Sequence, residues 1–122
     1  MRLLLDTSTF ILWHAGALKP APVRALRRAS QVFVSSVTAV EISLKTASGK
    51  LRLGRSVDEA VAAYGFTELP LTVRHGDRLA QVPSHHRDPF DRLLIAQAIE
   101  EGLTILTSDR VFELYQVSVE WA

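Results

Sequence analysis

The chain has 122 residues, 48% hydrophobic and 22% charged, a balance typical of a globular domain and unlike that of a disordered chain. The formal net charge of +1 excludes a strong overall basic field, so contacts with nucleic acid must come from local patches. The absence of cysteine excludes disulfides, thiolate metal sites and a cysteine nucleophile. With no apolar run long enough to cross a membrane, we expect one cytoplasmic domain over residues 1–122.

The first third of the chain alternates between apolar strands and helices. Three leucines leading into Asp6 predict a strand buried on both faces. A short helix is predicted over residues 10–14, and a helix with a proline in its first turn over residues 22–28. Residues 31–35 are rich in β-formers and predict the second strand.

Three helices and an edge strand are predicted in the middle of the chain. Residues 36–38 open a helix over 39–47, and the pattern Ser56 to Glu59 is typical of a capping box that starts a helix ending near residue 64. Residues 66–71 predict a strand that its proline confines to a sheet edge or to the strand end. A further helix is predicted over residues 72–82.

The last third again alternates. The most regular helix is predicted over residues 90–101, begun by Pro89 and ended by a glycine. Strands are predicted at residues 103–107 and 117–121, with a short helix at 110–115 between them. Strands that alternate with helices imply an α/β fold: a three-layer α/β/α arrangement with a mostly parallel central sheet.

Four acids are expected at one edge of this sheet. Asp6 follows the first strand, Asp109 follows the fourth, and Glu41 lies early in the helix after the second. Because the carboxyl ends of parallel strands meet at one edge, these side chains should converge. Asp91 joins them only if the loop at residues 83–88 carries the next helix start to that edge.

Each acid also has a purely structural interpretation. Asp88 and Asp91 flank a good helix start, and Thr38 with Glu41 matches a capping box. Asp6 and Asp109 begin no obvious helix with a matching partner, so turn formation is the alternative role for those two.

Converging carboxylates with no matching lysine or arginine repel one another and raise one another's pKa. A divalent cation would relieve this repulsion, and with oxygen ligands and no thiolates we expect Mg²⁺ or Mn²⁺. Such an ion can activate a water and hold a phosphate oxygen, so the implied chemistry is phosphodiester hydrolysis.

Several stretches resemble the PIN domain, and more closely the VapC-type toxins of bacterial type II toxin–antitoxin modules. They are Asp6-Thr7-Ser8, Glu41 in its helix, the run HRDPFDRLLIAQA from His86 to Ala98, and Leu106-Thr107-Ser108-Asp109. The resemblance covers essentially the whole chain in order, and the HRDPFDRLLIAQA run is its most specific part.

The resemblance implies a metal-dependent endoribonuclease with a PIN-like fold and an RNA substrate. By position, Asp6, Glu41, Asp91 and Asp109 would be the catalytic acids. Asp6 and Asp91 would hold Mg²⁺ or Mn²⁺, with Glu41 and Asp109 as further candidate ligands. Asp88 is then better interpreted as a helix cap, with an outer-sphere role as its alternative. The resemblance also implies a VapB-type antitoxin that blocks the site, and frequent homodimers.

Other polar residues near the acids have weaker signals. Arg87 and Arg92 are candidates for contact with the substrate phosphate. We interpret His85 and His86 as solvated loop residues, since they show no helical i, i+4 ligand spacing. Three hydroxyls are candidates for hydrogen bonds to the acids or to metal waters, with ordinary turn roles as the alternative: Thr7, Ser8 and Ser108.

Two rival functions remain open at this point. One is a non-catalytic α/β module that binds RNA or a protein, with the acids only capping helices. It predicts no effect of Mg²⁺ on thermal stability, whereas an acid cluster should be stabilised by metal. The other is an aspartyl-phosphate phosphatase, which usually needs a second acid two residues after Asp6, where this chain has Ser8.

Overall fold

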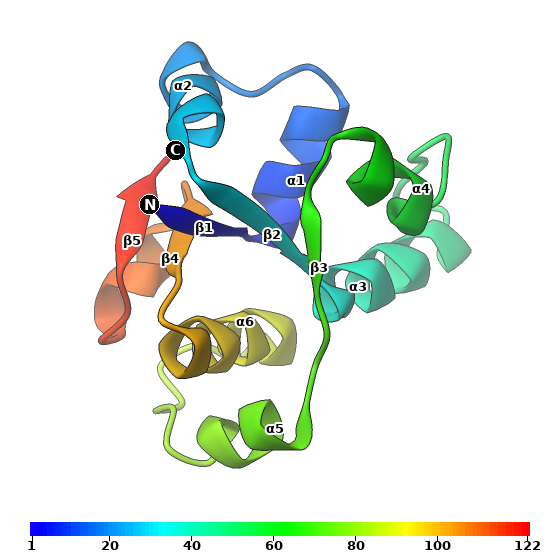
Figure 1. Ribbon diagram of the computed structural model, residues 1–122. Coiled ribbons are helices and arrows are strands. Elements are labelled where there is room, and N and C mark those ends of the chain that lie inside the picture. Colours follow the sequence, from blue (N-terminus) through cyan, green and yellow to red (C-terminus); the bar gives the residue numbers. More distant parts are fainter.

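The computed structural model describes residues 1–122, and a five-stranded sheet with the order β3-β2-β1-β4-β5 forms its centre (Figure 1). Every pairing in the sheet is parallel. The prediction of a mostly parallel sheet is therefore confirmed. The strands are β1 (Arg2–Leu5), β2 (Gln31–Ser35), β3 (Thr67–Leu69), β4 (Thr104–Thr107) and β5 (Val119–Trp121).

Strand β1 is central because its leucines are fully buried on both faces. Leu3 and Leu5 belong to one hydrophobic core, and Leu4 belongs to the other, as the alternation of side chains along a strand requires. β3 lies at the edge of the sheet and ends directly before Pro70, so both placements that the proline allowed, at a sheet edge and at the strand end, are found.

Helices cover both faces of the sheet, so the three-layer α/β/α arrangement is confirmed (Figure 1). The helices are α1 (Thr7–His14), α2 (Pro20–Arg28), α3 (Ser36–Ala47), α4 (Val57–Ala63), α5 (Val73–Leu79), α6 (Pro89–Glu101) and the 3₁₀ helix η1 (Arg110–Leu114). No helix is both long and apolar enough to cross a membrane.

The two hydrophobic cores are built by different helices. Helices α1, α2 and α4 contribute to the core around Leu3 and Leu5, whereas α6 and η1 contribute to the core around Leu4. Helix α3 contributes to both cores, and α5 packs on α6.

Two aspartates at strand ends cap helices, contrary to the interpretation that they begin none. Asp6 Oδ1 accepts a hydrogen bond from the Thr9 N–H at 2.8 Å, so α1 begins at Thr7 and not at residue 10. Asp109 Oδ1 accepts from the Val111 N–H at 3.0 Å and starts η1. A capping carboxylate needs only a free N–H in the first turn, so no matching side chain further along is required.

The capping box predicted at Thr38 and Glu41 is wrong. β2 runs directly into α3, and Ser35 serves as the cap by accepting from the Val37 N–H at 3.0 Å. Glu41 consequently lies inside α3, and a capping role no longer explains it. Helix α2 also begins two residues before the predicted start, and α5 ends at Leu79 instead of residue 82.

Candidate active site

Asp6 lies buried at the end of β1, with only 4% of its surface exposed. Its Oδ1 accepts from the backbone of Thr9, and its Oδ2 accepts from the hydroxyl of Thr107 at 2.6 Å. Burial raises the pKa of Asp6 above its usual range, although these hydrogen bonds offset part of the effect. No lysine or arginine forms an ion pair with Asp6, so its charge is stabilised by neutral groups alone.

Asp91 lies in the first turn of α6 and close enough to Asp6 for the two charges to interact. Burial, followed by the charge of Asp88, raises the pKa of Asp91 to about 6. The negative charge of Asp6 adds to this rise, and a hydrogen bond from His86 opposes it. The loop at residues 83–88 therefore brings the start of α6 to the carboxyl edge of the sheet, which meets the condition set by the sequence.

Asp109 is exposed, and its charge helps to raise the pKa of Asp6. Thr107 connects these two acids. Its hydroxyl donates to Asp6 and accepts from the backbone N–H of Asp109 at 3.0 Å. Thr107 was not among the predicted site residues, and its one signal in the sequence is a hydroxyl at the end of a largely apolar strand.

Glu41 is buried in α3 with 7% of its surface exposed. Its Oε2 lies 2.9 Å from Nζ of Lys45, one helical turn later. The expectation that the acids have no matching lysine is therefore wrong for Glu41, because i, i+4 neighbours meet on a helix surface. The other oxygen, Oε1, is buried and has no hydrogen-bond partner.

Glu41 and Asp88 line one open hollow of about 370 Å³ at the start of α6. Asp88 accepts from the Phe90 N–H at 2.9 Å, which confirms it as the cap of α6. The remaining lining residues combine two lysines with apolar and hydroxyl groups: Leu44, Lys45, Ser48, Lys50 and Phe90. Acids and cations therefore share this hollow.

A divalent cation such as Mg²⁺ or Mn²⁺ fits the acids. Their donors are carboxylate oxygens, which these ions prefer. Asp6 and Asp91 have raised pKa values, and neither contacts a lysine or arginine. Glu41 Oε1 is a buried acceptor that nothing in the chain satisfies, and such an atom is costly unless a cation or water meets it.

The three predicted hydroxyls do not contact the acids. Thr7 is buried, and its Oγ1 lies 3.0 Å from Oγ1 of Thr38, so it joins α1 to α3. Ser8 and Ser108 are exposed, and neither side chain makes a hydrogen bond to an acid. The bond between the two threonines holds the start of α1, which Asp6 caps, against the helix that carries Glu41.

The two predicted arginines differ in their surroundings. Arg87 is exposed. Arg92 donates from its guanidinium to the carbonyl oxygen of Val82 at 3.1 Å, and its Nε is buried without a partner. The guanidinium of Arg87 is therefore more accessible to a molecule in solution than that of Arg92.

His86 is not a solvated loop residue. Its Nε2 lies 2.9 Å from Oδ2 of Asp91, and its backbone N–H donates to the Tyr115 hydroxyl at 2.8 Å. The i, i+4 criterion missed this contact because the histidine lies in a loop that folds back onto the helix start. His85 is exposed and packs on the Tyr115 ring, with centroids 5.3 Å apart.

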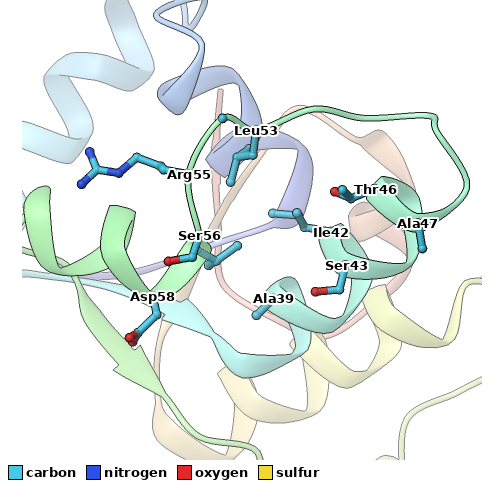
Figure 2. Close-up of a pocket in the computed structure, with 11 residues that line it drawn as sticks. Ala39, Ile42, Ser43, Thr46, Ala47, Leu53, Arg55, Ser56 and Asp58 are labelled. Atoms are coloured by element: carbon cyan, nitrogen blue, oxygen red, sulfur yellow. The ribbon is translucent and has the colours of Figure 1, made fainter.

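A second hollow of about 580 Å³ lies between α3 and the segment before α4 (Figure 2). Ala39 and Ile42 of α3 line it together with Leu53, while Arg55 and Asp58 supply charge (Figure 2). None of the predicted catalytic acids lines this groove.

Comparison with known proteins identifies the fold. The PIN domain family model matches residues 3–117. The fold is similar to that of VapBC2 from Rickettsia felis bound to a promoter DNA fragment, with 14% identity over 99% of this chain and 98% of that chain and a TM-score of 0.78. It is also similar to DNA-bound VapBC from Salmonella typhimurium, with 20% identity, coverage of 99% of this chain and 98% of that chain, and a TM-score of 0.74. VapBC-5 from Mycobacterium tuberculosis shares 23% identity, with coverage of 98% of this chain and 96% of that chain and a TM-score of 0.60. No curated protein sequence matches the chain.

Proposed function

This chain belongs to the PIN-domain family, and we propose that it is a metal-dependent endoribonuclease, the toxin of a type II toxin–antitoxin module. PIN domains are generally nucleases. The observation that carries the proposal is the clustering of Asp6, Asp91 and Asp109 at the carboxyl edge of the sheet, without a lysine or arginine to neutralise Asp6 and Asp91.

The four acids have distinct roles in this proposal. Asp6 and Asp91 would hold Mg²⁺ or Mn²⁺, with Glu41 and Asp109 as further candidate ligands. A divalent cation bound there would supply positive charge that activates a water and neutralises the scissile phosphate. Each oxygen of Asp6 accepts one hydrogen bond, so Thr9 and Thr107 fix its orientation and leave further lone pairs for a cation.

RNA is the proposed substrate, and the cations near the acids support this assignment. Lys45 and Lys50 line the hollow that contains Glu41 and Asp88, and Arg87 is exposed in the loop before α6. These side chains can contact the phosphates on either side of the scissile bond. Arg92 is the weaker candidate, because it already donates to the carbonyl of Val82.

The proposed partner is a VapB-type antitoxin. Several structures with this fold are described as VapBC toxin–antitoxin complexes, two of them bound to DNA. Val40 and Leu44 on α3 are more than half exposed and offer apolar surface for a partner helix. We also propose that the chain acts as a single domain and a homodimer in the cytoplasm, where RNA is found.

Substitution of Asp6 by asparagine tests the catalytic proposal. Asparagine also caps helices, so Asp6→Asn removes the negative charge and keeps the cap of α1. We expect RNA cleavage in Mg²⁺ to fall by about 10²-fold or more, the scale of losing one strong electrostatic contact in a transition state. RNA cleavage at the wild-type rate by an Asp6→Asn variant with a native circular dichroism spectrum would contradict the proposal.

A second measurement, on the wild-type protein, distinguishes the catalytic proposal from the rival interpretation of the chain as a non-catalytic binding module. If the acids only cap helices, Mg²⁺ leaves the melting temperature unchanged. If they form a cation site, Mg²⁺ raises the melting temperature with its concentration, and Asp6→Asn reduces that rise.

A further inference from the structure

We propose that His86 is a direct ligand of the divalent cation, together with Asp88 and Asp91, and that its imidazole makes this centre prefer Mn²⁺ to Mg²⁺. This proposal deepens the proposed function and rests on it in one respect: Asp91 is a metal ligand in both proposals. It adds a nitrogen donor to a centre otherwise made of carboxylates.

The three donor groups already have the spacing of metal ligands. One nitrogen of His86 and one oxygen each of Asp88 and Asp91 all lie within 4.8 Å of one another. The His86 Nε2 and Asp91 Oδ2 atoms are 2.9 Å apart. Neighbouring ligands around an octahedral ion with bonds of about 2.1 Å are about 3 Å apart, and opposite ligands about 4.2 Å. The group therefore needs little rearrangement to surround one ion.

The surrounding structure holds each donor in place. The backbone N–H of His86 donates to the hydroxyl of Tyr115, which is itself buried. Asp88 uses Oδ1 to cap α6, which leaves Oδ2 free of that bond. Asp91 is anchored in the first turn of the same helix. Such preorganisation lowers the cost of ordering the ligands on binding.

A buried acid next to Asp88 also lacks a partner. Glu41 is more than nine-tenths buried, its Oε1 has no hydrogen-bond partner, and it lines the same hollow as Asp88. A buried carboxylate oxygen without a partner is costly unless a cation or a water meets it, so this acid favours a cation in the hollow that it shares with Asp88.

The ligand set determines the expected selectivity. Mg²⁺ binds through oxygen atoms and retains several waters, whereas an imidazole nitrogen is a better donor to first-row transition ions. Two carboxylates and one imidazole should therefore bind Mn²⁺ more tightly than Mg²⁺. His85 serves as the natural comparison, because it is adjacent in sequence but exposed and packed on Tyr115.

Calorimetric titrations with Mn²⁺ and with Mg²⁺ test the selectivity in wild type, His86→Ala, His85→Ala and Asp88→Asn. We expect His86→Ala to weaken Mn²⁺ binding by about 10–100-fold, the range for removing groups around a metal, and to weaken Mg²⁺ binding much less. His85→Ala should leave both affinities unchanged. Asp88→Asn keeps the helix cap but removes a carboxylate, so it should weaken both ions. Equal Mn²⁺ affinity in His86→Ala and wild type would overturn the proposal.

Pulsed electron paramagnetic resonance of bound Mn²⁺ gives a second readout that needs no folded His86 variant. Wild type and His85→Ala should show coupling to an imidazole nitrogen. Bound Mn²⁺ without that coupling overturns the proposal even if His86→Ala fails to fold. The two proposals fail separately, because coupling without RNA cleavage rejects only the nuclease, and cleavage without coupling rejects only the histidine ligand.

Discussion

The Thr107 hydroxyl donates to Oδ2 of Asp6 at 2.6 Å, although the two residues are 101 positions apart in the sequence. The contact follows from the register of the two central strands. Leu5 of β1 is paired with Leu106 of β4, so the residues that follow each of them also lie side by side. Thr107 thereby orients the buried carboxylate around which the proposed metal centre is built.

The variant Thr107→Val tests this positioning role. Valine has nearly the shape of threonine but cannot donate a hydrogen bond, so Asp6 would lose one of the two bonds to its carboxylate. We expect the free energy of unfolding at neutral pH to fall by about 1–3 kcal/mol, as for a lost hydrogen bond to a buried charge. Denaturant unfolding measures this loss, and Mg²⁺-dependent cleavage should fall with it.

The control is Thr107→Ser, which keeps the hydroxyl and should stay closer to wild type in both measurements. Wild-type stability and cleavage in Thr107→Val would show that the contact does not position Asp6.

The raised pKa values of Asp6 and Asp91 predict an unusual dependence of stability on pH without metal. The pKa of Asp91 is about 6 in the folded chain, against 3.8 for an unperturbed group, so the folded state holds its proton more tightly. This contribution is fully present below about pH 4 and is lost as the pH rises through about 6. Thermal unfolding in a chelator should therefore show declining stability across that window.

A divalent cation should reverse this trend, because it binds the ionised carboxylates. The rise in melting temperature caused by Mg²⁺ should be larger at about pH 7.5 than at about pH 5. Asp91→Asn removes one of the titrating groups and should flatten both pH dependences. A metal effect that is equal at the two pH values contradicts this account.

The ion pair between Lys45 and Glu41 predicts competition with the cation. The Lys45 side chain is 42% exposed but that of Glu41 is only 9% exposed, so without this pair a buried carboxylate has no cation beside it. Lys45→Gln should therefore lower the stability of the metal-free protein by about 1–3 kcal/mol. It should also raise Mg²⁺ affinity, since Glu41 is released. Calorimetric titration with Mg²⁺ measures the change.

Lys50→Gln is the matched control. Lys50 lines the same hollow but forms no ion pair, so this variant removes the same charge without releasing Glu41. If both variants raised Mg²⁺ affinity equally, the effect would come from net charge and not from the pair.

His75 is a buried histidine outside the proposed metal centre, so its substitution should affect stability and not metal binding. His75 is 1% exposed, its Nδ1 accepts from the Thr72 N–H at 3.0 Å, and its Nε2 lies 2.8 Å from Glu101. Because Nδ1 accepts, the proton of the neutral ring is on Nε2, which donates to Glu101. His75→Phe should cost about 1–3 kcal/mol of unfolding free energy and leave Mg²⁺ affinity per folded molecule unchanged. A loss of Mg²⁺ affinity would show that the contact between α5 and α6 also supports the metal centre.

Much of the fold was predictable because its causes are local. Three consecutive leucines required a strand buried on both faces, and the alternation of strands and helices required a parallel sheet. The helix cap at Asp88 was also predictable from the sequence, since it depends only on the next few residues. The Glu41–Lys45 pair was equally local and was overlooked, although i, i+4 spacing is visible in the sequence.

The sequence by itself determined which elements form, in what order, and which acids end up at their ends. Tertiary structure decided which side chains touch those acids, because such contacts depend on strand register and loop path. Register placed Thr107, and not Ser108, against Asp6. The path of the loop before α6 turned His86 toward Asp91, a contact that no sequence period marks. Register and loop path are selected by packing of the whole chain on both faces of the sheet, so no local pattern contains them.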